Sequence, residues 1–160
     1  MNLVRVQQQD FDSRTVLGEL RAGRTDIGAT VTFIGYVRDL NLDDDVEAML
    51  LEHYPGMTEK ELGKIVDEAS SRWNVIAATV IHRVGDLVPG DEIVFVGVAS
   101  RHRGDAFQSC EFIMDFLKTR ATFWKKEKTP DGDRWLDMRA SDVEAAEHWG
   151  KHWGQSKGSE

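Results

Sequence analysis

The sequence predicts a two-layer α+β domain with a mostly antiparallel sheet, and two observations support this prediction. Segments rich in β-branched and aromatic residues come in consecutive pairs, and each pair precedes a segment whose apolar residues recur at helical spacing. Strands that follow one another without an intervening helix favour antiparallel pairing, with the helices covering the sheet. With 160 residues, 41% of them hydrophobic, the chain is long enough for one core and short for two.

Three helices are expected, and their order relative to the strands sets the topology. The first covers Asp10–Arg21 and precedes all the expected strands. The second has the clearest start in the sequence, because Thr58 and Glu61 have the spacing of a capping box. Its apolar residues fall on one stripe, which predicts a buried face: Leu62, Ile65, Val66, Ala69 and Trp73. The third runs from Asp105 to about Arg120.

Four strands are expected from β-branched and aromatic runs bounded by turn residues. Ala29–Arg38 and Val46–Tyr54 are separated only by a short acidic loop, which predicts that they pair as a hairpin. Val75–His82 and Asp91–Ser100 follow the second helix and are joined by a turn rich in glycine and proline. Gly35, inside the first strand, indicates a bulge or a close backbone approach.

The boundaries of the domain and its compartment follow from composition. We expect a single domain over residues 1–146 and a polar C-terminal tail, a candidate for disorder, over residues 147–160. No apolar run approaches the roughly 20 residues that span a bilayer, and the N-terminus lacks the layout of a signal peptide, which predicts a cytoplasmic protein. The lone Cys110 excludes an intrachain disulfide and is interpreted as a small buried apolar residue.

Charge is distributed unevenly along the chain. The formal net charge is -8, which disfavours nonspecific nucleic-acid binding because the phosphate backbone is also negative. Residues 101–128 nevertheless hold seven lysines and arginines against four acids. A locally positive segment in an acidic protein suits a small anionic ligand better than a long polyanion.

Several basic residues are candidates for an anion site. Ser100–Gly104, with two arginines, lies where a strand ends and a helix begins, where free backbone N–H groups and the helix dipole favour anions. Lys118 and Lys125 are seven residues apart and would share one face of a continuing helix, near the arginines. Neighbouring cations favour the neutral amine that a lysine needs to act as a nucleophile or proton carrier. Arg38, at a strand end, has the geometry to grip a phosphate.

Each of these residues also has a structural interpretation: a solvated basic turn, lysines favoured at a helix C-terminus, or a surface arginine. His148 and His152 have the spacing of helical metal ligands, but no third ligand is near them in sequence, so we expect no metal site. Phosphate-cradling, dinucleotide-binding and nucleophile-elbow motifs are absent from the sequence. The residues alone therefore indicate a small anion-binding α+β domain with candidate lysines.

Five segments together resemble the large, catalytic subunit family of molybdopterin synthase, and their order and spacing match as well. They are Phe33-Ile34-Gly35-Tyr36-Val37-Arg38, Leu51-Glu52-His53-Tyr54-Pro55-Gly56-Met57, His82-Arg83-Val84-Gly85, Ser100-Arg101-His102-Arg103, and Asp115-Phe116-Leu117-Lys118 with Phe123-Trp124-Lys125-Lys126-Glu127. Each motif is weak alone, but five in order over about residues 29–135 make chance similarity improbable. Thr122 departs from the family's usual proline, which puts the link between Lys118 and Lys125 in question.

The resemblance implies an α/β hammerhead fold and a central homodimer with a small ubiquitin-like subunit at each end. The small subunit's C-terminal Gly-Gly thiocarboxylate would enter a pocket on this chain and donate sulfur. The acceptor would be cyclic pyranopterin monophosphate, which two transfers convert to the dithiolene of molybdopterin in molybdenum cofactor biosynthesis. No cofactor, metal, nucleic acid or membrane partner is implied.

The resemblance also implies roles for individual residues. Lys118 would be the catalytic lysine, with Lys125 as its catalytic partner. The implied substrate-binding residues are Tyr36, Val37, Arg38, His102, Arg103, Lys126, Glu127 and Arg139. Of these, Arg139 would act across the dimer in the neighbouring pocket.

Two other functions fit parts of the same pattern. A noncatalytic receptor for a ubiquitin-like Gly-Gly tail would use the basic groove only for docking, although a single carboxylate does not require two lysines. A nucleotide- or RNA-binding module is disfavoured by the acidic net charge and by the lack of aromatic RNA-binding strand motifs.

Overall fold

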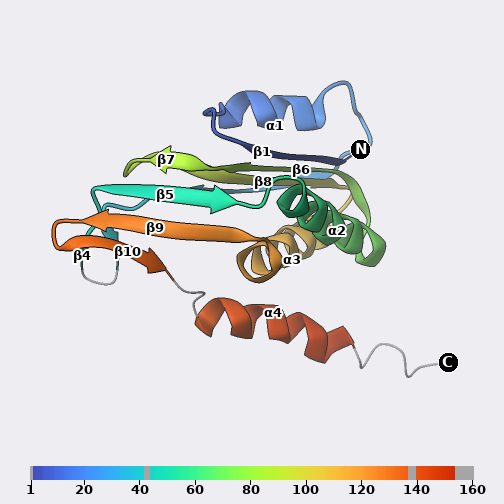
Figure 1. The fold of residues 1–160 in the computed structure, drawn as a ribbon. Coiled ribbons are helices and arrows are strands. Elements are labelled where there is room, and N and C mark those ends of the chain that lie inside the picture. The colour runs from blue at the N-terminus through green and yellow to red at the C-terminus, as the bar shows by residue number, and fades with distance from the viewer. Residues whose placement is uncertain (1, 42–43, 137–139, 154–160) are drawn as a thin grey trace.

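The computed structural model describes residues 2–41, 44–136 and 140–153 of the chain. Its strands form two four-stranded sheets and a small two-stranded hairpin. Helices lie on both faces of the first sheet, and the second sheet projects from one end of it (Figure 1). The expected α+β class with mostly antiparallel strands is confirmed.

The first sheet forms the body of the molecule, in the order β1-β6-β8-β2. Its strands are β1 (Asn2–Gln7), β6 (Val75–Arg83), β8 (Glu92–Ser100) and β2 (Ala29–Tyr36). β1 pairs in parallel with β6, whereas β6 and β2 both pair antiparallel with β8. β8 is buried from Ile93 to Ser100, which explains its nearly continuous apolar sequence. β1 was not among the strands expected from the sequence.

The second sheet has the order β10-β9-β5-β7, and all its pairs are antiparallel. Its strands are β5 (Ala48–His53), β7 (Gly85–Leu87), β9 (Phe123–Thr129) and β10 (Gly132–Leu136). The separate hairpin consists of β3 (Leu40–Asn41) and β4 (Asp44–Asp45). The predicted hairpin between the first two strands is therefore wrong, because β2 pairs with β8 while β5 pairs with β7 and β9.

A local irregularity marks the place where β2 leaves the first sheet. The register with β8 shifts between Gly35 and Tyr36, as the predicted bulge requires. A Cβ at Gly35 would lie 2.7 Å from Val94 Cγ1, so the close approach predicted at this glycine is also present. The chain then turns into β3 and reaches the second sheet through β5.

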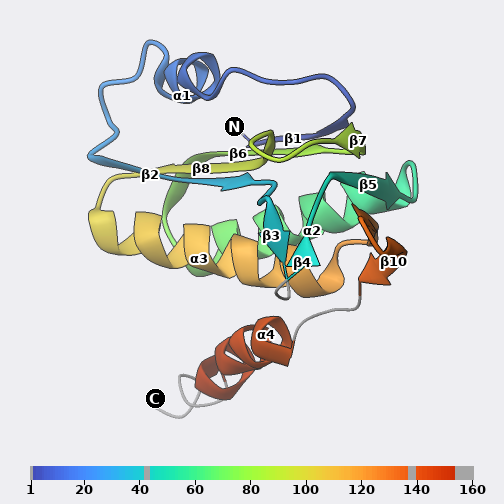
Figure 2. The same ribbon diagram turned by 90° about the vertical axis from the view of Figure 1, so that its left-hand side faces the viewer.

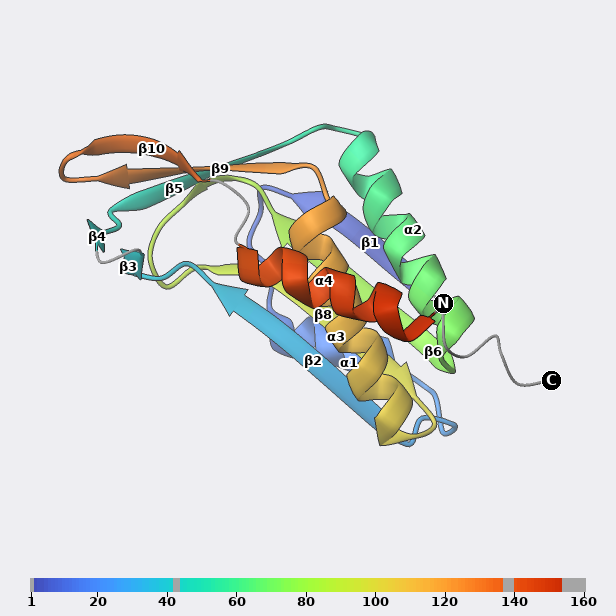
Figure 3. The ribbon, with the colours of Figure 1, turned by 90° about the horizontal axis from the view of Figure 1, so that it is seen from below.

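The helices divide the core into two parts. α1 (Ser13–Arg21) covers one face of the first sheet, and α2 (Met57–Arg72) and α3 (Arg103–Arg120) cover the other (Figures 1 and 2). The main core lies beneath α2 and α3, and smaller clusters lie beneath α1. α4 (Ala140–Trp153) lies outside α3, away from the sheet (Figure 3).

The start of α2 differs from the predicted capping box. The helix begins at Met57, and the Glu59 carboxylate accepts a hydrogen bond of 2.7 Å from the N–H of Gly56. Thr58 is fully buried instead of capping the helix. Its hydroxyl lies 2.8 Å from the hydroxyl of Thr122 and donates to the Thr122 carbonyl at 3.0 Å. A tertiary contact thus takes the side chain that local spacing assigned to a cap.

Helix α4 crosses the domain boundary expected at residue 146. Trp149 Nε1 donates to Asp115 Oδ2 at 2.7 Å, and the indole packs edge-on against Trp73 and Phe112. His148, on the same helix, is exposed, and the side chain of His152 lies outside the described part of the structure. In the described residues, no group of three or more potential metal ligands is present, and no helix is long and apolar enough to cross a membrane.

Candidate functional site

A buried histidine lies where the two sheets meet. His82, near the end of β6, is 4% exposed and stacks on Phe123 of β9, with ring centroids 4.0 Å apart. Its Nδ1 lies 2.8 Å from the Arg83 carbonyl oxygen, which can only accept, so Nδ1 carries the hydrogen and Nε2 is left as an acceptor. Sequence reasoning did not assign His82 a role in the site.

Burial and nearby charged residues shift the pKa of His82. Burial is the main cause that lowers its pKa from 6.5 to about 3, with smaller electrostatic contributions from Lys125, Lys118 and His53, whereas the hydrogen bond with the Arg83 carbonyl opposes the change. The ring is therefore neutral at physiological pH. Both candidate lysines therefore lie within electrostatic range of the same buried ring.

The two lysines lie on different elements, whereas the prediction placed them on one face of a continuing helix. Lys118 is exposed in the last turn of α3, but the helix ends at Arg120, and Lys125 lies half-buried in β9. A helix end and a strand, rather than one continuous helix, therefore carry the two lysines. The connecting Thr122 is held against Thr58 by two hydrogen-bond contacts.

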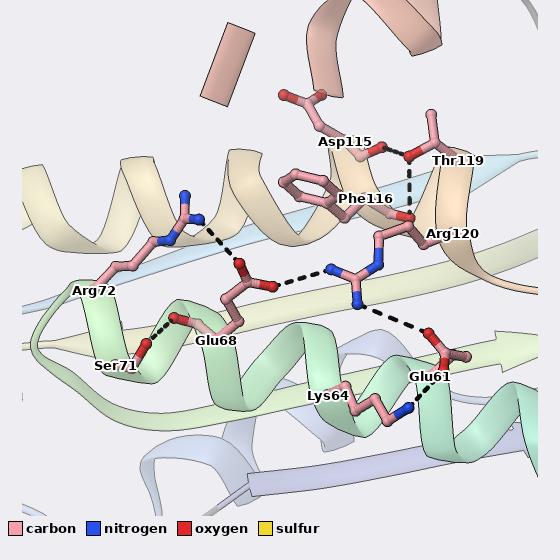
Figure 4. Close-up of polar contacts among 9 residues, drawn as sticks. All are labelled: Glu61, Lys64, Glu68, Ser71, Arg72, Asp115, Phe116, Thr119 and Arg120. Carbon is pink, nitrogen blue, oxygen red and sulfur yellow. Dashed lines mark hydrogen bonds and ion pairs between the residues drawn. The ribbon is translucent and has the colours of Figure 1, made fainter. Parts of the chain in front are cut away.

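Ion pairs fix the C-terminal end of α3 against α2 (Figure 4). Arg120 Nη1 lies 3.0 Å from Glu68 Oε2, and its Nη2 lies 3.8 Å from Glu61 Oε2. The other Glu68 oxygen accepts from Arg72 at 2.9 Å. These partly exposed pairs each contribute little, but the connected set restricts the helix turn that carries Lys118.

A second set of contacts joins Arg38 to the same region. Arg38 Nη2 donates to Asn41 Oδ1 at 3.3 Å, and Asn41 Nδ2 donates to both oxygens of Glu127 at 3.0 Å. Arg134 pairs with the same carboxylate at 3.1 Å. Glu127 is two residues beyond Lys125 in β9 and therefore shares its face of the strand. Because Glu127 is 1% exposed, its carboxylate is part of the interior and does not line the surface.

The neighbours of Arg38 and Lys125 take different positions. Val37 is 3% exposed, and its backbone exchanges hydrogen bonds with Asp91 (2.9 Å) and Gly90 (2.8 Å). Tyr36 is 55% exposed. Lys126 lies on the opposite face of β9 from Lys125, with Nζ 3.6 Å from Asp133 and 5.6 Å from the centroid of the Trp135 ring.

His102 and Arg103 lie far from the lysines of the same chain. β2 pairs Tyr36 with Glu92 at the start of β8 and Ala29 with Ser100 at its end, so α3 begins at the end of the sheet opposite to Arg38. Arg103 and Lys118 are separated by 15 residues of helix, which corresponds to about 22 Å. The expected proximity of the lysines to Arg103 is wrong within one chain. Arg139 lies outside the described residues.

Comparison with known proteins decides the family. The family model described as MoaE protein matches residues 6–120. The chain belongs to the MoaE protein family. The molybdopterin synthase catalytic subunit of Ralstonia nicotianae is 58% identical over 150 residues, which cover 94% of this chain and 85% of the relative. The subunit of the same name from Escherichia coli is 62% identical over 128 residues, covering 80% and 85%.

A solved structure supports the same assignment. The molybdopterin biosynthesis MoaE protein from Burkholderia ambifaria is 55% identical, with a TM-score of 0.81, and the match covers 94% of this chain and 99% of that one. The resemblance predicted from five short motifs is therefore confirmed. The MoaE relatives carry the name of a catalytic subunit, so this chain belongs to a family of enzymes.

The cysteine of this MoaE family member lies in the interior, as predicted. Cys110 is 4% exposed, and its Sγ lies 3.8 Å from the Val96 carbonyl. Burial, with a contribution from Glu111, raises the pKa of the thiol to about 12. Because the thiolate is the reactive form of cysteine, Cys110 is unsuited to carry sulfur. Lys118, Lys125 and Arg38 remain as candidates, because their cationic side chains are suited to binding anions.

Proposed function

We propose that this chain is the catalytic subunit of molybdopterin synthase and acts as a sulfurtransferase. It would transfer sulfur from the C-terminal thiocarboxylate of a small ubiquitin-like subunit to cyclic pyranopterin monophosphate. One observation carries the proposal: in a MoaE family chain, Lys118 and Lys125 both act electrostatically on His82, and Glu127 on the Lys125 face of β9 connects to Arg38. The two reactants are both anions, and fixed cations offset the cost of bringing them together.

The charges divide naturally between the reactants. Each transfer forms a carbon–sulfur bond to the pterin, and the carbon that gains sulfur loses an oxygen substituent, which leaves as water or as the freed phosphate ester oxygen. The carbon–sulfur bond of the thiocarboxylate breaks at the same time, and its acyl carbon takes oxygen from water to become a carboxylate. Lys118 and Lys125 would stabilise the charge that develops on the acyl group and move protons. Arg38 would bind the phosphate through a guanidinium, whose paired N–H groups match two phosphate oxygens. The backbone around Tyr36 and Val37 would line the pterin.

A second copy of the chain would complete the site. His102 and Arg103 lie about 22 Å from Lys118 along α3, too far to touch the same small molecule. We therefore assign these residues, together with Arg139, to the site of the neighbouring protomer in a homodimer. Lys126, on the outer face of β9, would contact the small subunit's tail or the substrate from the other side of the strand.

Reconstitution with a thiocarboxylated Gly-Gly partner and the cyclic pterin tests the proposal, with dithiolene formation read by mass spectrometry. Lys118→Ala should abolish product while the protein stays folded, and Lys118→Arg separates charge from proton transfer because arginine does not give up its proton. Lys60→Ala is the matched control, since Lys60 is exposed on α2 and lies outside α3 and β9.

The same experiment distinguishes the alternative function. A noncatalytic receptor for the Gly-Gly tail would bind the partner but form no dithiolene with the unaltered chain. Turnover by Lys118→Ala at the rate of the unaltered chain would overturn the role of this lysine.

A further inference from the structure

The carboxylate of Glu127 is the centre of a buried polar network that links three separate segments. Glu127 lies in β9, Arg134 lies directly opposite it in β10, and Asn41 comes from β3. Arg134 reaches Glu127 Oε1 through Nε at 3.2 Å and Nη2 at 3.1 Å, and its Nη2 also donates to the Asn41 carbonyl at 2.9 Å. Arg134 therefore holds both the carboxylate and the backbone of the residue next to it.

The orientation of the Asn41 amide follows from its partners. Its Nδ2 lies 3.0 Å from both Glu127 oxygens, which can only accept while the carboxylate is ionised. Its Oδ1 faces Arg38 Nη2, which can only donate. The reverse orientation would oppose donor to donor and acceptor to acceptor, so the network permits only one. Asn41, 8% exposed, thus transmits the position of a buried carboxylate to an exposed arginine.

The contact that holds Arg38 does not neutralise its positive charge. Glu127 and Arg134 form a pair that is neutral overall, and Asn41 carries no charge. Arg38 is therefore held through a neutral amide, and its positive charge is left for a ligand. A carboxylate in the place of Asn41 would hold the guanidinium but would also cancel its charge.

We propose that Asn41 and Arg134, acting through Glu127, are positioning residues that orient the Arg38 guanidinium toward the phosphate of the substrate. The inference rests on the proposed function and deepens it: Glu127 acts from the interior, and Arg38 makes the contact. A long arginine side chain loses conformational freedom on binding, and one that is already held in place loses less. The network therefore raises affinity for the phosphate-bearing substrate without touching it.

Steady-state kinetics with the small partner and the cyclic pterin monophosphate test the proposal. Asn41→Ala should raise KM for the pterin about tenfold and change kcat by less than about threefold, because one charge-assisted contact loses its orientation. Asn41→Ser keeps a hydroxyl near Glu127 but withdraws the carbonyl from Arg38, so it should raise KM similarly in a chain that keeps its fold. The KM effect should vanish in an Arg38→Ala background. Asn41 variants that leave KM unchanged, or that raise it equally in the Arg38→Ala background, would overturn the proposal.

A second measurement does not depend on turnover. The side-chain Nε–H signal of Arg38 in ¹⁵N NMR should show restricted motion in the unaltered chain and increased motion in Asn41→Ser, whereas Lys60→Ala should change nothing. Equal mobility of Arg38 in the unaltered chain and in Asn41→Ser refutes the positioning role. An unaltered chain that forms no dithiolene refutes the proposed function instead, and the NMR comparison still decides whether Asn41 holds Arg38.

Discussion

The two ends of helix α3 differ in how the fold surrounds their basic residues. At the C-terminal end, Lys118 lies in a turn that ion pairs hold against α2, and its charge acts on the buried His82. At the N-terminal end, His102 and Arg103 are exposed, and the His102 side chain makes no capping hydrogen bond. Contacts within a single chain surround the C-terminal end of α3, whereas the N-terminal end exposes its basic residues to solvent.

This difference teaches that a run of basic residues in sequence need not be one site in space. The segment 101–128 is locally positive, yet α3 separates its two basic groups by about 22 Å. If both basic groups bind the same anionic substrate, the N-terminal group must come from one copy of the chain and the C-terminal group from another.

Mixing two inactive variants tests this division and has the largest expected effect. Lys118→Ala and Arg103→Ala should each form little product alone. Co-refolded in equal amounts, they should recover about a quarter of the unaltered activity, because half the dimers are mixed and half the sites in those carry no substitution. Dithiolene formation by mass spectrometry measures the recovery. Mixtures as inactive as the separate variants would contradict a site shared between copies.

Stability should respond to the buried network and not to the exposed end. Arg134→Ala leaves Glu127 buried without its ion-pair partner and should lower the free energy of unfolding by about 3 kcal/mol. Arg103→Ala, on an exposed turn, should change it by less than about 0.5 kcal/mol. Urea unfolding followed by circular dichroism compares the two variants. Equal midpoints would show that the network does not stabilise the fold.

The buried His82, which interacts with Lys118 at the C-terminal end of α3, should make the free energy of unfolding depend on pH. The pKa of His82 falls from 6.5 to about 3 on folding, so its contribution is fully present above pH 6.5 and is lost as pH falls toward 3. The unfolded chain binds a proton that the folded chain refuses, which corresponds to a loss of up to about 1.4 kcal/mol per pH unit. Urea unfolding of the unaltered chain and of His82→Gln between pH 7 and 5 should show a shallower decline for the variant. Parallel curves would contradict a neutral His82 in the fold.

The middle of α3 should contribute least to the chemistry. Cys110 lies between the two ends, and burial keeps its thiol protonated. Cys110→Ala should therefore change the rate of sulfur transfer by less than about twofold, because the thiol form is a poor nucleophile. The reconstituted assay measures this rate. Loss of turnover in a folded Cys110→Ala protein would show that the Cys110 thiol takes part in sulfur transfer.

Local signals in the sequence predicted half of the described helices and strands, but not how the strands pair. The runs that form β2, β5, β6 and β8 were identified, as were the first three helices, because burial imposes a period of two on strands and about 3.6 on helices. Pairing β2 with β5 was wrong, since side-chain alternation carries no information about which neighbour a strand selects. β9 was missed because it holds three lysines and a glutamate in seven residues and lacks the run of β-branched residues that marks a strand. The spacing of Lys118 and Lys125 was considered only for the case that the helix continued.

The candidate site was predicted in part. Residue type and motif spacing singled out Lys118, Lys125 and Arg38, and the structure places all three in one region. His82, Asn41 and Arg134 were missed as site residues, because nothing local distinguishes them from ordinary polar residues. A signal for His82 existed in its position near the end of a largely apolar strand, where a buried polar group needs a partner.

The sequence by itself determined the family, the identity of the candidate residues and the periodicities from which helices and strands form, because these depend on side-chain chemistry and near neighbours. Only the tertiary structure decided which cations meet. Whether a lysine faces a buried imidazole, or an arginine is held by an asparagine 3 residues away and a carboxylate 86 residues beyond it, depends on packing between distant segments. The strength of an electrostatic interaction depends on the distance between the charges and on their burial. The order of residues along the chain gives neither quantity.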